Sequence, residues 1–368
     1  MASPSSTVWE IEPRTKAKHE ILKRYLQAWA PILTHGGFPQ VLYIDGFAGP
    51  GRYSKGEDGS PIISLNVAIQ GSIPERTKVQ FVFVEKDNDR AKNLKGLVQS
   101  IDLPSNVEAE VIGGRGMVQA FNEVKRKYGN NFGRLPPTFA FIDPFGWTGV
   151  PFSIVHEIMR SPSCEVLITL MYEEVNRFLG HPDQEKNFDN FFGTGDWKQG
   201  VQLKGACPRK NFLHDLYARQ LRNVAKAKYV RSFEMRNKRN VVDYFLFHAT
   251  NNYLGLKKMK EAMWKVDESG EYSFSDATDS NQIVLFAKTP NIDKLKSQLV
   301  KQFGGKTATV EEIERFVVEK TAFRETHFKR QILRPLELAI PPRIEPVNPP
   351  SNRKRGTFGD KALILRFI

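Results

Sequence analysis

The distribution of apolar residues along the chain predicts a parallel β-sheet with helices between its strands. Nearly continuous apolar runs at 41–44, 79–84, 107–112, 138–142 and 165–172 are typical of strands that are buried on both faces. From Thr15 to Trp29, apolar residues recur at helical spacing, which predicts an amphipathic helix. Residues 226–235 and 241–249 indicate two further strands. The first 288 residues are therefore expected to form one α/β domain.

The pattern changes after Pro290, where a small second domain over residues 289–368 is expected. Helical spacing at 291–303, 310–318 and 326–338 is followed by a basic turn at 353–358 and a strand at 362–367. Helix, helix and basic hairpin together resemble a winged helix-turn-helix domain. In such a domain the second helix and the hairpin contact nucleic acid, which makes candidates of Arg330, Arg334, Arg353, Lys354 and Arg355. A small domain used for dimerisation or for docking a protein is the alternative.

Composition narrows the class of protein. A formal net charge of +13 and a pI near 9.5 favour a polyanionic partner such as DNA or RNA. Two cysteines among 368 residues exclude a disulfide framework and a four-cysteine zinc site, so no metal site is predicted and a cytoplasmic protein is expected. The polar start of the chain does not resemble a signal peptide, and no apolar run reaches membrane-spanning length.

The most informative motif is the turn that follows the first strand, Asp45-Gly46-Phe47-Ala48-Gly49-Pro50-Gly51. Gly49 and Gly51 allow positive φ and a close approach of the backbone to a ligand. The turn lacks the Lys-Ser/Thr of a phosphate-binding loop and the full G-x-G-x-x-G of a dinucleotide site. It therefore favours another nucleoside cofactor, with S-adenosylmethionine as the best candidate and Asp45, Phe47, Gly49 and Gly51 as its contacts. A glycine turn without a ligand is the alternative.

Two more strands end in an acid. Glu85 follows the run 79–84, and Asp143 follows the run 138–142. Because the carboxyl ends of parallel strands meet at one edge of a sheet, where α/β folds bind ligands, these acids are expected to lie beside the glycine turn. Glu85 is placed to accept hydrogen bonds from ribose hydroxyls, and Gly113, after the run 107–112, is a candidate neighbour of the cofactor adenine.

These motifs match known enzymes. The glycine turn resembles the cofactor motif of class I methyltransferases, a resemblance that also implies an antiparallel strand pair at 226–249. The sequence Asp143-Pro144-Phe145-Gly146 is similar to the Asp/Asn-Pro-Pro-aromatic motif of enzymes that methylate amino groups of nucleic-acid bases. The resemblance implies that Asp143 and the Pro144 carbonyl accept hydrogen bonds from the target amine, while an aromatic ring stacks on the extruded base.

The chain departs from this pattern at two positions, because Phe145 replaces the second proline and Gly146 replaces the aromatic residue. Phe145 and Trp147 are the two rings that could replace it, and a turn of altered shape could equally have lost the chemistry. The hypothesis is an S-adenosylmethionine-dependent nucleic-acid methyltransferase that modifies the N6 amino group of adenine. A methyltransferase-like binding protein without catalysis is the alternative. A cytosine-C5 enzyme is disfavoured because neither cysteine follows a proline in a catalytic turn.

Other segments resemble one bacterial family along nearly the whole chain. Trp9 to Pro13, Thr15 to His19, the glycine turn, Gly59 to Pro61 and Lys260 to Asp267 look like the three-Cys-motif partner (TcmP) proteins. That resemblance implies a partner protein that carries three cysteines and resembles a radical S-adenosylmethionine enzyme. The first domain also resembles bacterial ribosomal RNA adenine-N6 methyltransferases. Within the first helix, Lys18 and His19 are interpreted as surface or capping residues, and His248 as a packed sheet residue.

Overall fold

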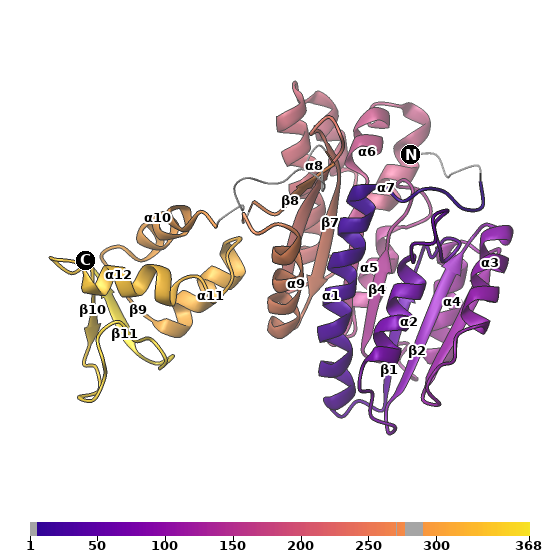
Figure 1. Ribbon diagram of the computed structural model, residues 1–368. Coiled ribbons are helices and arrows are strands. Elements are labelled where there is room, and N and C mark those ends of the chain that lie inside the picture. Colours follow the sequence, from indigo (N-terminus) through magenta and orange to yellow (C-terminus); the bar gives the residue numbers. More distant parts are fainter. Residues whose placement is uncertain (1–5, 270, 277–289) are drawn as a thin grey trace. The chain divides into compact units, whose positions relative to one another are not determined.

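The computed structural model describes residues 6–269, 271–276 and 290–368, so the domain boundary expected at 288–289 lies outside the described residues. The chain divides into two compact units (Figure 1). The first comprises Met1–Ala262 and Ser273–Gln282, and the second comprises Met263–Tyr272 and Ile283–Ile368. Each unit has its own apolar core and is described by itself.

The first unit is built on an eight-stranded sheet with the order β3-β2-β1-β4-β5-β7-β6-β8. The five strands from β3 to β5 are parallel, and β7 runs antiparallel to both β5 and β6. The α/β fold and the antiparallel pair are therefore confirmed. The strands are β1 (Gln40–Asp45), β2 (Lys78–Glu85), β3 (Val107–Gly113), β4 (Thr138–Ile142), β5 (Glu165–Leu170), β6 (Tyr229–Arg236), β7 (Val242–Thr250) and β8 (Ser273–Ser275).

Helices cover both faces of this sheet, as the nearly continuous apolar strands require. Alternate β1 residues point to opposite faces, so Leu42 and Ile44 share a core with α4, α5, α7 and α8, whereas Tyr43 joins the aromatic side chains of α1 on the other face. The helices are α1 (Pro13–His35), α2 (Ser60–Gln70), α3 (Asn88–Gln99), α4 (Met117–Tyr128), α5 (Phe152–Met159), α6 (Tyr172–Phe178), α7 (Glu185–Phe192), α8 (Ala206–Asn223) and α9 (Tyr253–Val266), with 3₁₀ turns η1 (Pro182–Gln184) and η2 (Asp196–Gln202).

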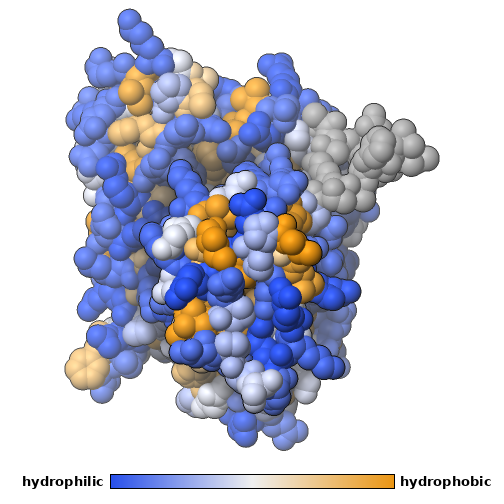
Figure 2. Space-filling view, turned by 90° about the vertical axis from the view of Figure 1, so that its left-hand side faces the viewer, coloured by the Kyte–Doolittle hydropathy of each residue, from blue (hydrophilic) through white to orange (hydrophobic). Residues whose placement is uncertain are grey.

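The second unit packs helices against a three-stranded antiparallel sheet of order β10-β11-β9. Its elements are α10 (Ile292–Phe303), β9 (Thr307–Thr309), α11 (Val310–Lys320), a π-helical turn η3 (Lys329–Leu333), α12 (Arg334–Leu338), β10 (Ile344–Val347) and β11 (Ile364–Phe367). Thr309 and Glu312 cap α11 reciprocally, which fixes where that helix begins. On the face of this unit that Figure 2 shows, apolar residues lie among hydrophilic ones.

The helix expected at 326–338 differs from the prediction. Regular helical structure begins at Lys329, and its first turn is π-helical, with the Leu333 N–H bonded to the Phe328 carbonyl at 2.8 Å. Pro335 follows directly and has no N–H to donate, so the ordinary α-helical ladder is interrupted at this point. No helix in the described residues is both long and apolar enough to cross a bilayer.

Candidate functional site

The glycine turn after β1 is fixed to the strands on either side of it. The Gly46 N–H donates to the Phe141 carbonyl of β4 and the Ala48 N–H to the Val84 carbonyl of β2, both at 2.9 Å. Gly49 and Gly51 have φ of 64° and 87°, the region that favours glycine. A Cβ at Gly51 would also lie 2.8 Å from Leu94 of α3. Backbone conformation and packing therefore both require glycine here.

Glu85, at the end of β2, holds this turn from the other side. Its Oε2 accepts a hydrogen bond from the Gly49 N–H at 2.9 Å, and its Oε1 accepts one from the Asp87 N–H at 2.8 Å. Burial raises the pKa of the Glu85 carboxyl, although these two hydrogen bonds oppose the shift. The acid expected to meet the cofactor ribose thus also shapes the glycine turn.

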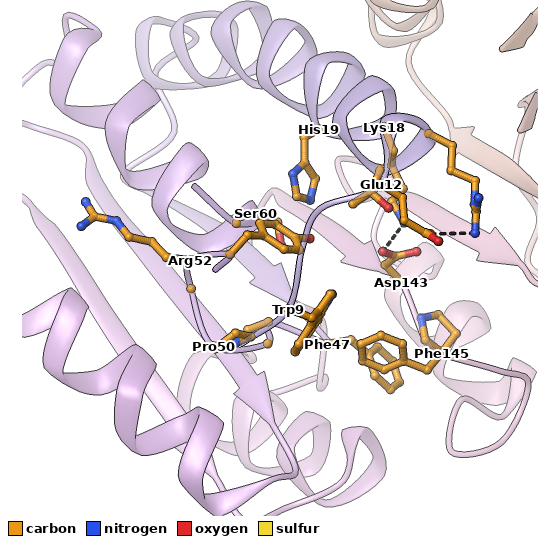
Figure 3. Close-up of a pocket in the computed structure, with 18 of the residues that line it drawn as sticks. Trp9, Glu12, Lys18, His19, Phe47, Pro50, Arg52, Ser60, Asp143 and Phe145 are labelled. Atoms are coloured by element: carbon orange, nitrogen blue, oxygen red, sulfur yellow. Dashed lines mark hydrogen bonds and ion pairs between the residues drawn. The ribbon is translucent and has the colours of Figure 1, made fainter. Parts of the chain in front are cut away.

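Asp143, after β4, faces a buried lysine that the sequence analysis had assigned to the surface. Its Oδ2 accepts from Lys18 Nζ in an ion pair, and its Oδ1 accepts from the Thr169 hydroxyl of β5 at 2.6 Å. Lys18 is only 5% exposed, and its ammonium lies 4.9 Å from the centre of the Tyr244 ring on β7. The surface interpretation of Lys18 was wrong because the stripe of α1 that carries it turns inward. Figure 3 shows Lys18 opposite Asp143.

Residues Trp9–Arg14, called here the N-terminal strap, cross the site from outside. The Trp9 carbonyl accepts from the Ser54 N–H at 2.9 Å, which ties the strap to the polar insert after the glycine turn. The Trp9 ring meets Tyr53 and Phe145 edge-on, with centroids 5.9 and 5.8 Å away. At the other end of the strap, Arg14 forms ion pairs of 2.5–2.7 Å with three carboxylates, those of Glu12, Asp243 and Asp276.

Two adjoining cavities open beside this turn, and Phe47 and Phe145 line both. The smaller, about 290 Å³, is bounded by the strap, the glycine turn and Asp143. The larger is an open groove of about 1260 Å³ whose walls include Glu85, Asp87 and Met117. The carboxyl edge of the sheet therefore offers a roomy groove next to a small aromatic chamber, as Figure 3 shows for the chamber.

Two buried polar side chains belong to this region: His19 lines the chamber, whereas Asp45, at the end of β1, is fully buried and lines neither cavity. Burial, together with the nearby carboxylates of Asp143 and Glu85, raises the pKa of Asp45 to about 7. Burial and the neighbouring Lys18 cation lower the pKa of His19 to about 3, so its imidazole is neutral. Asp45 Oδ2 and His19 Nδ1 are buried without a hydrogen-bond partner in the described part of the chain.

These features fit S-adenosylmethionine. The groove supplies Glu85 and Asp87 carboxylates for ribose hydroxyls, and the chamber supplies aromatic faces for a cationic sulfur. Among the described residues, no three His, Cys, Asp or Glu side chains are grouped as a metal site requires.

The other residues predicted to contact the cofactor or the base, Gly113, Phe145 and Trp147, differ in whether they line a cavity. Gly113 packs against α3, where a Cβ would lie 2.8 Å from that of Ala91, and the groove is lined instead by the residues that follow. Trp147 is 8% exposed and stacks on Phe188, with ring centres 5.2 Å apart. Phe145 lines both cavities. Trp147 borders only the groove, so Phe145 is the one of the two candidate rings that reaches the chamber.

The five basic residues predicted to contact nucleic acid in the C-terminal unit differ in their exposure and in their partners. Arg353 forms a bidentate ion pair with Glu337 at 2.7 and 2.8 Å; Glu337 is buried and Arg353 is partly buried. Arg355 donates to the Glu337 carbonyl at 2.8 Å, although much of the residue remains exposed. Arg330, Arg334 and Lys354 are exposed. Contact with nucleic acid stays a prediction for all five, and Arg353 has a structural task besides.

The sequence analysis missed the side chains that α1 and the strap bring to the chamber. A signal for them exists, because Arg14 and Lys18 precede Ile21, Leu22 and Tyr25 on the apolar stripe of the helix. Charged residues on an inward stripe need partners, so they indicate a buried polar site. His248 is fully buried and bonded to Glu165 at 3.0 Å, as expected of a packed sheet residue.

No family model and no curated protein matches this chain. Similar solved structures include the protein LPL1258 from Legionella pneumophila, 14% identical over 65% of this chain and 85% of that one, with a TM-score of 0.39. Trm1 from Pyrococcus horikoshii with S-adenosylmethionine is 13% identical over 72% and 62%, with a TM-score of 0.36. An O-methyltransferase from Bacillus cereus with S-adenosylhomocysteine is 14% identical over 67% and 84%, also at 0.36.

Two of these structures contain S-adenosylmethionine or its demethylated product. The chain spans less than two thirds of the Trm1 structure.

Proposed function

We propose that this protein transfers a methyl group from S-adenosylmethionine to an amino group of a nucleic-acid base, the N6 amino group of adenine. The observation that carries the proposal is the position of Asp143. It lines the small chamber beside the glycine turn, and the Phe145 ring opens on the same space. A carboxylate next to an accessible aromatic face suits an extruded base that carries an exocyclic amine.

In this proposal the groove holds the nucleoside part of the cofactor and the chamber holds its methionine end and the target amine. When bound, S-adenosylmethionine would supply a methyl group on a cationic sulfur: a C–N bond forms as the C–S bond breaks, the sulfur keeps the electron pair, and the amine loses one proton. Asp143 and the Pro144 carbonyl accept hydrogen bonds from the amine and so orient its lone pair. Phe145 stacks on the base.

The C-terminal unit is proposed to bind the nucleic acid as a winged helix. Its order of helix, strand, two helical segments and a hairpin, with β11 between β9 and β10, supports this arrangement. Residues 290–368 hold 16 Lys and Arg against nine Asp and Glu, about half of the net charge of the chain. Exposed Arg330, Arg334 and Lys354 would contact phosphates, since such contacts release counterions.

The resemblance to the three-Cys-motif partner proteins adds a second binding partner, a three-cysteine protein similar to radical S-adenosylmethionine enzymes. The second candidate function, nucleic-acid binding without catalysis, is favoured by one observation. The Asp143 carboxylate is already engaged by Lys18 and Thr169, and the residue after Phe145 is a glycine.

Mass spectrometry of nucleosides tests the proposal. Purified protein is incubated with isotopically labelled S-adenosylmethionine and separate pools of DNA and RNA, which are then digested. We expect labelled N6-methyladenosine or its deoxy form from the wild type and none from Asp143→Ala, with Asp102→Ala, on the exposed loop after α3, as the matched control. Label on another base would correct the target. An inactive wild type that still binds nucleic acid would support the second candidate instead.

A further inference from the structure

Lys18 and Asp143 place a hydrogen-bond donor directly beside an acceptor inside the chamber. A lysine ammonium has three N–H bonds, and Asp143 accepts one of them. The Tyr244 ring lies 4.9 Å from Lys18 Nζ and covers one side of it. Thr169 fixes the other oxygen of Asp143 at 2.6 Å, so the carboxylate cannot turn away from Lys18. The pair is held in place and still has hydrogen-bonding capacity for a ligand.

We propose that Lys18 is a specificity-determining residue, which donates a hydrogen bond to the ring nitrogen next to the target amine. The inference rests on the proposed function and adds the feature by which the site recognises its base. Lys18 lies on α1 and lines the same chamber as Asp143 and Phe145. A base stacked on Phe145 with its amine at Asp143 would present the adjoining edge to the Lys18 ammonium.

The donor and acceptor pattern of the bases decides which of them fits. Adenine has the N6 amino donor between two ring acceptors, N1 and N7, and cytosine has the N4 amino donor beside N3. Uracil and thymine carry only carbonyl oxygens at the corresponding position, which would meet the Asp143 carboxylate acceptor to acceptor. Guanine meets it in the same way through O6, and only its N2 amino group beside N3 offers the pattern that adenine and cytosine offer. The Asp143–Lys18 pair therefore selects an amine flanked by an unprotonated ring nitrogen.

The contribution of Lys18 concerns recognition rather than the transfer step. A donor at the ring nitrogen withdraws electron density from the amine, so it cannot make the amine more nucleophilic. Its benefit is a charge-assisted hydrogen bond to the correct base, whereas a wrong base leaves one N–H of the buried, Asp143-paired ammonium without a partner. A site built in this way rejects an analogue that lacks only the ring nitrogen.

The test uses single-stranded DNA and RNA oligonucleotides that contain one adenine, replaced in turn by 1-deazaadenine, 7-deazaadenine, cytosine or guanine. Methyl transfer from labelled S-adenosylmethionine is measured as kcat/KM. The wild type is expected to lose roughly 10- to 100-fold on one of the two deaza analogues, the scale of a lost hydrogen bond to a charged group. In Lys18→Met the ratio of kcat/KM on adenine to kcat/KM on that analogue should fall to near one, because activity on adenine itself declines to the level of the analogue.

Lys16→Met is the matched control, since Lys16 lies two residues earlier on α1 and is 57% exposed. It should keep the discrimination of the wild type. If Lys18→Met melts below the assay temperature, Lys18→Gln, which keeps a donor without the charge, should retain part of the discrimination. Equal rates of the wild type on adenine and both deaza analogues, or unchanged ratios in Lys18→Met, would overturn the role of Lys18 and leave the proposed function standing. A wild type that methylates none of the oligonucleotides would refute both.

Discussion

Replacing Glu85 should damage the protein in two separable ways. The carboxylate accepts from two backbone N–H groups, that of Gly49 at 2.9 Å in a buried position and that of Asp87 at 2.8 Å in a partly buried one. Glu85→Ala leaves both donors unpaired. A buried unpaired donor costs about 1–3 kcal/mol, so the two together should lower the free energy of unfolding by roughly 2–6 kcal/mol. The lower end applies where water reaches the Asp87 N–H.

Glu85→Gln separates the two effects, because its amide oxygen can replace one of the two acceptors. We expect it to lose about half as much stability as the alanine variant. Both variants should also weaken binding of S-adenosylhomocysteine, by about 1–3 kcal/mol for the lost charged acceptor of the ribose. The alanine variant should lose more, because the glycine turn itself is no longer held.

Denaturant unfolding followed by tryptophan fluorescence measures the stability, and titration calorimetry with S-adenosylhomocysteine measures the affinity. Glu75→Ala, an exposed position in the loop before β2, is the control and should match the wild type in both assays. Wild-type affinity in Glu85→Gln would refute contact with the ribose. Equal stability of Glu85→Ala and the wild type would refute the role of the carboxylate in the turn.

Three further outcomes are expected. Burial raises the pKa of Asp45 to about 7, so between about pH 4 and pH 7 this carboxyl is protonated in the folded protein and ionised in the unfolded one. The free energy of unfolding should therefore fall as the pH rises through that range. Denaturation at several pH values should show the fall in the wild type and not in Asp45→Asn. Arg353→Ala should lower the unfolding free energy by about 1–3 kcal/mol, because the Glu337 carboxylate loses its bidentate partner and keeps the hydrogen bond from the Gly356 N–H. Lys354→Ala should instead weaken nucleic-acid binding in a salt titration at unchanged stability. Phe145→Ala should weaken base binding by about 1–3 kcal/mol with little effect on the melting temperature. Trp147→Ala should lower the melting temperature with little effect on base binding.

The strands and the glycine turn could be predicted because their signals are local. A strand buried on both faces needs consecutive apolar residues, and each of the predicted parallel strands lies within its predicted run or differs from it by a residue or two. The turn is defined by glycines at positive φ, which few other residues tolerate. β9 and β10 were missed, since three or four residues at the edges of a small sheet carry little pattern.

The chamber could not be predicted in the same way, because its parts come together only in the folded chain. Lys18 and Asp143 are 125 residues apart, and Trp9, near the start of the first unit, contacts Phe145, which follows its fourth strand. Charge alone also gives only part of the account of Arg353. The sequence shows a basic run, but it does not show that one member of that run forms a bidentate ion pair with Glu337.

The neighbouring side chains explain why the sequence Asp143-Pro144-Phe145-Gly146 differs from the Asp/Asn-Pro-Pro-aromatic motif. Trp147 fills the space between Phe178 and Phe188, with ring centres 5.2 Å from each, so the turn must direct it into the core. Gly146 has no ring to offer, and a Cβ built there would meet nothing within 4 Å. The ring that reaches the chamber is that of Phe145, and Trp9 contacts it edge-on at 5.8 Å. Because Trp9 belongs to the strap, the stacking face in the proposed function would be built from two segments, the turn after β4 and the strap.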